Sequence, residues 1–163
     1  MKNNYVGLVV DAPYLYAAKE VLGGNVDYVK LYNKVSEFGE ISHAVVHTKD
    51  MPGQRKFLAA LKSTGYEVFS KNGDSESRWW IQEVAKSILM AAPHVSHLVV
   101  AVGDARLAPI LEFAEMNWGC QITVMGFRDR TDEDILDIAG AGFVEVDTEY
   151  AYATRLTAEL VGN

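Results

Sequence analysis

Two aspartates follow closely on short apolar segments that have the composition of buried strands. Asp11 comes directly after the segment 5–10, and Asp104 comes two residues after the segment 97–102. If these segments are neighbouring parallel strands, their carboxyl ends meet at one edge of the sheet, where ligands of such sheets bind. Clustered carboxylates can hold a divalent metal ion that activates water. The pattern therefore predicts one acidic cleft that contains both side chains.

A simpler explanation of the same two residues stays open. Each aspartate precedes a predicted helix, where its carboxylate can accept hydrogen bonds from free backbone N–H groups without touching a metal. Capping explains either residue alone. The occurrence of both at the ends of buried strands favours a functional or inherited site, although an inherited site need not be active.

The segments around the two aspartates alternate between strand type and helix type. Short runs rich in β-branched residues predict strands at 5–10, 42–47, 66–70, 97–102, 121–126 and 143–146. Apolar residues at helical spacing predict helices at 12–22, 27–38, 54–63, 74–92, 104–116, 132–139 and 148–160, with Asp74 as the cap of the longest. Such alternation implies right-handed crossovers and a central parallel sheet. We therefore expect one three-layer, Rossmann-like α/β domain over residues 1–163, with helices on both faces of the sheet.

Length, composition and charge limit the classes of protein to which this chain can belong. Its 163 residues, 49% of them hydrophobic, suit a single packed domain. The apolar stretches fall far short of the ~20 residues that a membrane helix needs. Since no secretory signal is recognisable, we expect a cytoplasmic protein without a membrane partner. The net charge of −7 argues against a protein that coats duplex phosphates, but local basic patches are compatible with it.

Four segments, in this order and spacing, resemble the NYN domain, a branch of the PIN-like ribonucleases, and within it the LabA-like group. The family opens with a strand followed by Asp-Gly-Pro-Asn-Leu-Tyr, and its late turn reads Gly-Asp-x-Asp. The matching segments of this chain are Val9 to Tyr16, Gln54 to Val68, Val100 to Ile110 and Cys120 to Phe127. The resemblance implies a PIN-like version of the expected fold.

It also implies a catalytic site that this sequence matches only in part. Family members use about four acidic side chains to hold Mg²⁺ or Mn²⁺, which activates water against an RNA phosphodiester. Asp11 and Asp104 match two of these catalytic and metal-binding positions, whereas Arg106 replaces the second acid of the late turn. Trp79 stands where we place the acid of the long helix, and Tyr14 replaces the asparagine of the first motif. Losing two anions and gaining a guanidinium should weaken cation binding severely.

Other acids can compensate for this loss. Glu83 lies one turn after Trp79 and can supply a displaced metal-binding carboxylate, although pairing with Lys86 is the alternative. If the alignment over residues 73–80 is shifted, Asp74 or Glu76 moves nearer to the cleft. Both are otherwise explained as residues that favour the start of a helix.

Aromatic and basic residues suggest that the cleft binds RNA. Trp79 and Trp80 cannot share one helix face, so if Trp80 packs inward, Trp79 lies at the edge. There it can stack on an unpaired base beside Tyr14, with Arg78 or Arg106 meeting phosphate. The same side chains can anchor a protein partner, or both tryptophans can belong to the core.

Two further groups have weaker patterns. His43 and His47 share one face of a strand, but no cysteine or acidic motif accompanies them, which disfavours a zinc site. Tyr150, Tyr152 and Leu160 can form a homodimer surface, with packing against the sheet as the alternative.

The leading hypothesis is an NYN-type protein associated with single-stranded RNA. Its metal-dependent ribonuclease activity is weakened or lost, and its cleft binds RNA or protein. The first alternative is an active ribonuclease that uses Mg²⁺ or Mn²⁺. The second is a protein-binding module without nucleic acid. Whether the protein is an enzyme stays open at the level of the sequence.

Overall fold

The computed structural model describes residues 3–151, whose strands form one six-stranded sheet of order β3-β2-β1-β4-β5-β6. All neighbouring strands pair in parallel. The strands are β1 (Tyr5–Asp11), β2 (Glu40–Lys49), β3 (Glu67–Lys71), β4 (His97–Ala101), β5 (Gln121–Gly126) and β6 (Phe143–Glu145). The central strands β1 and β4 are almost completely buried, as is typical of a sheet covered on both faces.

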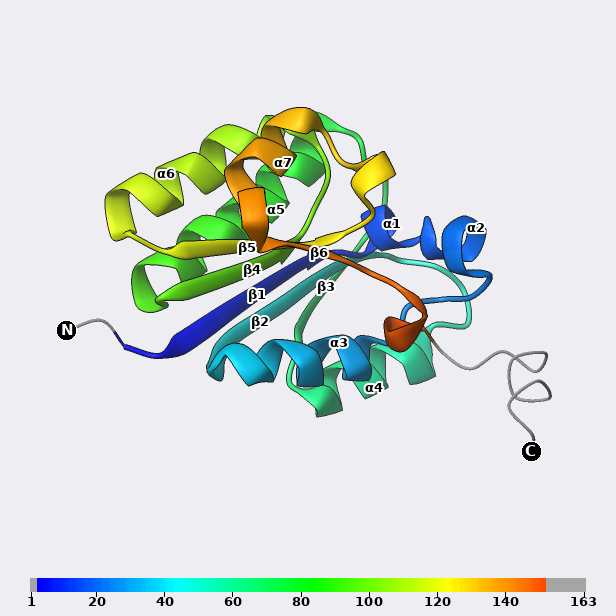
Figure 1. Ribbon diagram of the computed structural model, residues 1–163. Helices are drawn as coiled ribbons and strands as arrows, with labels where there is room; N and C mark the ends of the chain where they lie inside the picture. Colours follow the sequence, from blue (N-terminus) through cyan, green and yellow to red (C-terminus); the bar gives the residue numbers. More distant parts are fainter. Residues whose placement is uncertain (1–2, 152–163) are drawn as a thin grey trace.

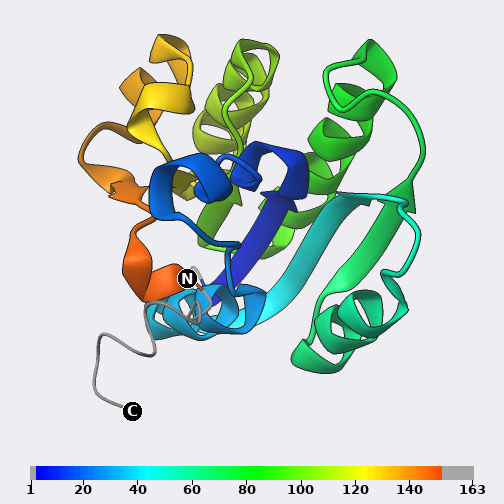
Figure 2. The ribbon, with the colours of Figure 1, turned by 90° about the vertical axis from the view of Figure 1, so that its right-hand side faces the viewer.

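Helices cover both faces of this sheet, as the sequence predicts (Figure 1). One layer contains α3 (Tyr28–Val35) and α4 (Arg55–Thr64), and the other contains α5 (Arg78–Ala91), α6 (Ala108–Trp118) and α7 (Glu133–Ala139). The short helices α1 (Ala12–Leu15) and α2 (Ala18–Leu22) lie at the carboxyl edge of the strands, which faces the viewer in Figure 2. Single 3-10 turns are η1 (Ser36–Phe38), η2 (Ala92–His94), η3 (Ala105–Leu107), η4 (Arg128–Arg130), η5 (Gly140–Gly142) and η6 (Thr148–Tyr150).

The strand order reverses between β1 and β4, and this reversal positions the two aspartates. The chain first builds outward from β1 to β2 and β3, then returns to the other side of β1 with β4. In register, Val10 lies opposite Ala101, so both strands end at the same height. Ligands of open α/β sheets bind at such a point, which confirms the predicted neighbourhood of the two strand ends.

The sheet has one hydrophobic core on each face. The core under α3 and α4 includes Val10 and Leu31, and the core under α5 and α6 includes Trp80 and Leu111, all with 2% exposure or less. Burying a side chain of this kind is worth roughly 1.5–3 kcal/mol. The two cores therefore hold the strands in place from both faces of the sheet, including the strand ends that carry the two aspartates. Among residues 3–151, no helix is long and apolar enough to cross a bilayer.

The start of the longest helix differs from the prediction. Asp74 does not cap α5; its carboxylate accepts the N–H of Glu76 inside the preceding loop. The helix begins at Arg78, where the Ser77 hydroxyl accepts the N–H of Trp80 at 3.1 Å. Either residue type can cap a helix, and the conformation of the loop decides between them.

Three other predicted helices also differ from the structure. The segment 12–22 is broken into α1 and α2, and the segment 104–116 starts as the 3-10 turn η3 before α6 begins. The segment 148–160 starts as η6, after which Ala151 pairs with Val26 in an antiparallel bridge. Tyr150 packs inside the molecule with 3% exposure, whereas Tyr152 and Leu160 lie outside the described residues.

Tyr14 fastens α1 to the ends of β4 and β5. Its hydroxyl accepts the N–H of Phe127 at 2.9 Å and hydrogen-bonds to Thr131. Its ring lies so close to Gly103 and Gly126 that a Cβ at either position would overlap it. These two glycines are therefore required by the close approach of a ring and not by backbone conformation.

Replacing Gly126 by alanine should lower the free energy of unfolding by about 1–3 kcal/mol, because the new methyl group collides with the Tyr14 ring. Urea denaturation measures this cost. In a Tyr14→Ala background the same substitution should cost clearly less, since the collision is absent. Equal costs in the two backgrounds would contradict the proposed contact.

Candidate functional site at the carboxyl edge

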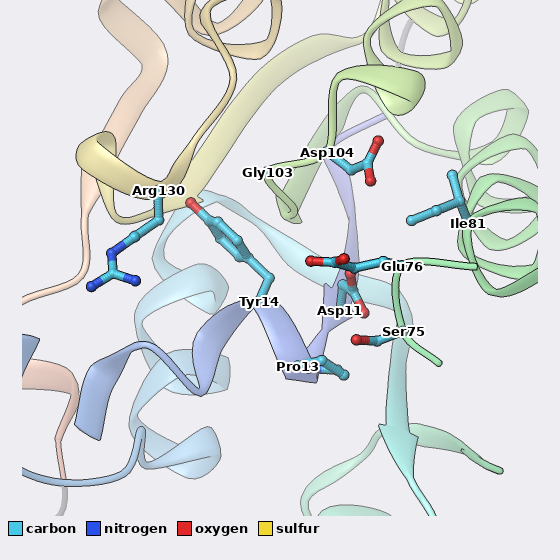
Figure 3. A pocket seen from close by; sticks show the side chains of 9 residues that line it. All are labelled: Asp11, Pro13, Tyr14, Ser75, Glu76, Ile81, Gly103, Asp104 and Arg130. Atoms are coloured by element: carbon cyan, nitrogen blue, oxygen red, sulfur yellow. The ribbon is translucent and has the colours of Figure 1, made fainter. Parts of the chain in front are cut away.

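A pocket of about 240 Å³ lies where β1 and β4 end (Figure 3). It is lined by Asp11, Pro13, Tyr14, Ser75, Glu76, Ile81, Gly103, Asp104 and Arg130. Three carboxylates from different elements thus line one pocket, and they include both predicted aspartates. The first two come from neighbouring strand ends, and the third comes from the loop between β3 and α5.

Asp11 is buried and hydrogen-bonded to α5. Only 6% of the residue is exposed, and its Oδ1 accepts the indole N–H of Trp80 at 2.9 Å. The side chain does not cap α1, so helix capping does not explain this aspartate. Burial raises the pKa of Asp11 to about 6, while the Trp80 hydrogen bond and the charge of Lys71 act in the opposite direction. Asp11 therefore takes up a proton much more readily than an ordinary carboxylate does.

Asp104 is held by Arg106 through both of its oxygens. Its Oδ1 accepts the backbone N–H of Arg106 at 2.9 Å and the Nε–H at 3.0 Å, and its Oδ2 accepts from Nη2 at 2.7 Å. These hydrogen bonds lower the pKa of Asp104. The backbone contact is a cap of η3, so the capping explanation holds here beside any other role.

Arg106 also reaches across the rim of the pocket. Its Nη2 donates to the carbonyl oxygen of Glu76 at 2.7 Å, which ties the loop before α5 to the end of β4. This contact helps to place the Glu76 side chain at the pocket. Glu76 is one of the two acids that a shifted alignment over residues 73–80 would move nearer to the cleft, and in the structure it lines the pocket.

Glu83 is not among the residues that line this pocket. Its carboxylate is bonded to Lys86 at 3.1 and 3.3 Å, the alternative that the sequence left open. A role for Glu83 as a metal ligand stays a prediction.

The two tryptophans of α5 face apart, as the helical spacing predicts. Trp80 is completely buried, whereas half of Trp79 is exposed. Arg78, the first residue of the helix, is also exposed. Neither Arg78 nor Trp79 lines the pocket, so any contact that they make with a ligand lies beside it.

Sequence reasoning did not single out Lys71 as a residue of this site. Lys71 ends β3, and its Nζ lies 4.0 Å from the centroid of the Trp80 ring. It is one of the charges that act on Asp11. The available signal was its place at the end of a predicted strand, the same signal that identified the aspartates.

The carboxylate oxygens of the pocket are not arranged as ligands for Mg²⁺ or Mn²⁺. Such ions need several ionised or neutral oxygen ligands that are free to coordinate. Here both oxygens of Asp104 are bonded to Arg106, and one oxygen of the buried Asp11 is bonded to Trp80. Within the described part of the chain, no group of three or more His, Cys, Asp or Glu side chains is arranged to hold a metal ion.

Replacing Asp11 by asparagine should stabilise the protein at pH 8. The folded protein binds the Asp11 proton more tightly than the unfolded chain does, so stability is lost as the pH rises through about 6. Asparagine keeps an oxygen for Trp80 and carries no charge. The gain in free energy of unfolding should be on the order of 2–3 kcal/mol at pH 8 and much smaller at pH 4.

Urea denaturation at the two pH values measures this difference. Asp137→Asn, at an exposed position of α7, is the control and should show no comparable gain. Destabilisation of Asp11→Asn at pH 8 would show that ionised Asp11 is favourable in the folded state.

Comparison with known proteins gives a family and a fold. The family model of the NYN domain matches residues 5–147. No curated protein matches the chain. Among solved structures, the chain is similar to a protein of unknown function from Vibrio parahaemolyticus, with 22% sequence identity and a TM-score of 0.81. That similarity covers 93% of this chain and 100% of the other, and it shows a shared α/β fold. Since the family model spans both strand-end aspartates and most of the sequence, this chain belongs to the NYN domain family.

Proposed function

We propose that this protein binds single-stranded RNA at the carboxyl edge of its sheet, and that its metal-dependent ribonuclease activity is weakened or lost. NYN domains have a PIN-like, nuclease-type fold and are generally metal-dependent nucleases. We place the chain in the LabA-like group of that family. The observation that carries the proposal is the Arg106 guanidinium, which is bonded to both oxygens of Asp104.

A metal ion would have to displace this guanidinium. The Arg106 side chain donates to both Asp104 oxygens and to the Glu76 carbonyl, and such charge-assisted hydrogen bonds are stronger than neutral ones. The ion would also need Asp11 ionised, although burial favours the protonated form near pH 6. Both requirements reduce the affinity for a divalent cation.

The same edge offers contacts to RNA. Trp79 and Arg78 are exposed at the start of α5, and the Arg106 side chain is about half exposed at the rim. An aromatic face stacks on unpaired bases, and basic side chains meet phosphates. Tyr14 lines the pocket, but its hydroxyl is already hydrogen-bonded to Phe127 and Thr131. Its contribution to RNA binding would therefore be contact with the aromatic ring.

The second candidate is an active ribonuclease that uses Mg²⁺ or Mn²⁺. The third carboxylate of the pocket, Glu76, favours it, because this acid approaches Asp11 and Asp104 from the start of α5. Ordinary family activity would then require Arg106 to leave Asp104.

Cleavage of a labelled single-stranded RNA in Mg²⁺ or Mn²⁺ separates the two candidates. We expect no cleavage above that of Asp11→Asn, while the RNA still binds in a fluorescence anisotropy assay. Cleavage by the wild type that disappears in Asp11→Asn would establish the active ribonuclease. Absence of RNA binding would contradict the proposed function itself.

Replacing Arg106 by aspartate should increase Mn²⁺ affinity by about tenfold or more, because it frees Asp104 and adds an anion. Isothermal titration calorimetry measures the affinity, and circular dichroism checks the fold. Arg78→Asp is the matched control, since it makes the same change of charge at an exposed position of the same edge. Equal Mn²⁺ affinities of wild type, Arg106→Asp and Arg78→Asp would refute the blocking role of Arg106.

A further inference from the structure

Lys71 lies beside the pocket in a niche of aromatic and polar side chains. Its Nζ is 4.0 Å from the centroid of the Trp80 ring and 5.4 Å from that of Trp79. It is also 2.8 Å from Nδ1 of His47. The ammonium group thus lies near two indole rings and is hydrogen-bonded to an imidazole.

The direction of these hydrogen bonds follows from chemistry. A lysine ammonium group only donates, so Lys71 donates to Nδ1 of His47, and the imidazole carries its proton on Nε2. That Nε2–H donates to the hydroxyl of Ser87 on α5 at 2.8 Å. The imidazole is buried and stacks on Phe69, with 5.2 Å between the ring centroids. Burial, followed by the charge of Lys71, lowers the pKa of His47 to about 3, which keeps the ring neutral.

This arrangement fixes the ammonium group in one position. One of its three N–H donors is used by His47, and the side chain remains partly exposed. A cation on a fixed support loses little conformational freedom when it binds an anion, in contrast to a lysine on an open surface. The charges of Asp11 and Glu83 raise the pKa of Lys71, but burial lowers it by more.

Trp79 gives the niche an exposed aromatic wall. Half of this residue is accessible, and its neighbour in space is the Lys71 ammonium. A ligand that suits both side chains has a flat ring and an anionic group a short distance apart. A nucleotide of an unpaired strand has both, and its base is free to stack, which is not the case in a duplex.

We propose that Lys71 and Trp79 form a nucleotide subsite at the end of β3, in which the phosphate contacts the Lys71 ammonium group and the base stacks on Trp79. This subsite rests on the proposed binding of RNA and extends it beyond the pocket. It needs no metal ion, since the positive charge belongs to the protein.

Fluorescence anisotropy with a single-stranded oligouridylate of about ten nucleotides, within the usual span of such sites, tests the subsite. EDTA is present throughout. Trp79→Ala should weaken binding by about fivefold to a hundredfold. Lys71→Met should weaken binding and reduce the slope of log affinity against log salt by about one. The matched controls are Phe113→Ala, another exposed aromatic, and Lys62→Met, another exposed lysine, and both should stay within about twofold of the wild type.

The dependence on pH gives a second readout. Asp11, Glu83 and His47 face the ammonium group, and Lys49 is its register partner on β2. Burial lowers the pKa of Lys71 to about 8, so wild-type affinity should fall as the pH rises from 7 to 9. Lys71→Arg keeps its charge over this range and should bind with little pH dependence.

The outcomes are distinguishable. If the wild type and both subsite variants bind RNA equally, the subsite is refuted while the proposed function stands. If the wild type does not bind RNA, both are refuted, and Trp79 is better explained as a contact for a protein. If Lys71→Arg loses affinity with rising pH as the wild type does, deprotonation of Lys71 is not the cause of the loss, and the proposed contact between its ammonium group and the phosphate is refuted.

Discussion

The hydrogen bond between the Trp80 indole and the Asp11 carboxylate joins the end of β1 to the first turn of α5, and the candidate site depends on it. A buried indole N–H needs an acceptor, and a buried carboxylate needs a donor. Each residue therefore satisfies the other. With Trp80 fixed inward, the next position on the helix leaves Trp79 half exposed. The aspartate for which the sequence predicts a metal-binding role thus has a structural role.

Positive charge at this edge is supplied by side chains. Arg106 neutralises Asp104 by direct contact, and Lys71 acts on Asp11 from the end of β3. The two cations differ in exposure and in chemistry, because the guanidinium stays charged whereas burial makes the ammonium group easier to deprotonate. An edge of this kind can attract an anion without help from a bound ion, even though the whole chain has a net charge of −7.

Much of the fold follows from the sequence, because alternating strands and helices leave few topologies and place strand ends at one edge. Asp11 and Asp104 could be paired on this basis, and the different directions of Trp79 and Trp80 follow from helical geometry. The start of α5 could not be predicted, because several residues suited to capping precede it and the loop conformation selects one of them. Nor could the niche of Lys71, because it combines side chains from three separate elements without any periodic pattern.

The Tyr14 ring has a consequence for the path of any extended ligand. It covers the ends of β4 and β5, where it packs over Gly103 and Gly126. A ligand in the pocket therefore meets an aromatic ring on that flank, together with the Arg130 side chain. The opposite flank is formed by Ser75 and Glu76 of the loop before α5, so the two sides of the pocket differ in chemistry and a ligand would be received by an asymmetric surface (Figure 3).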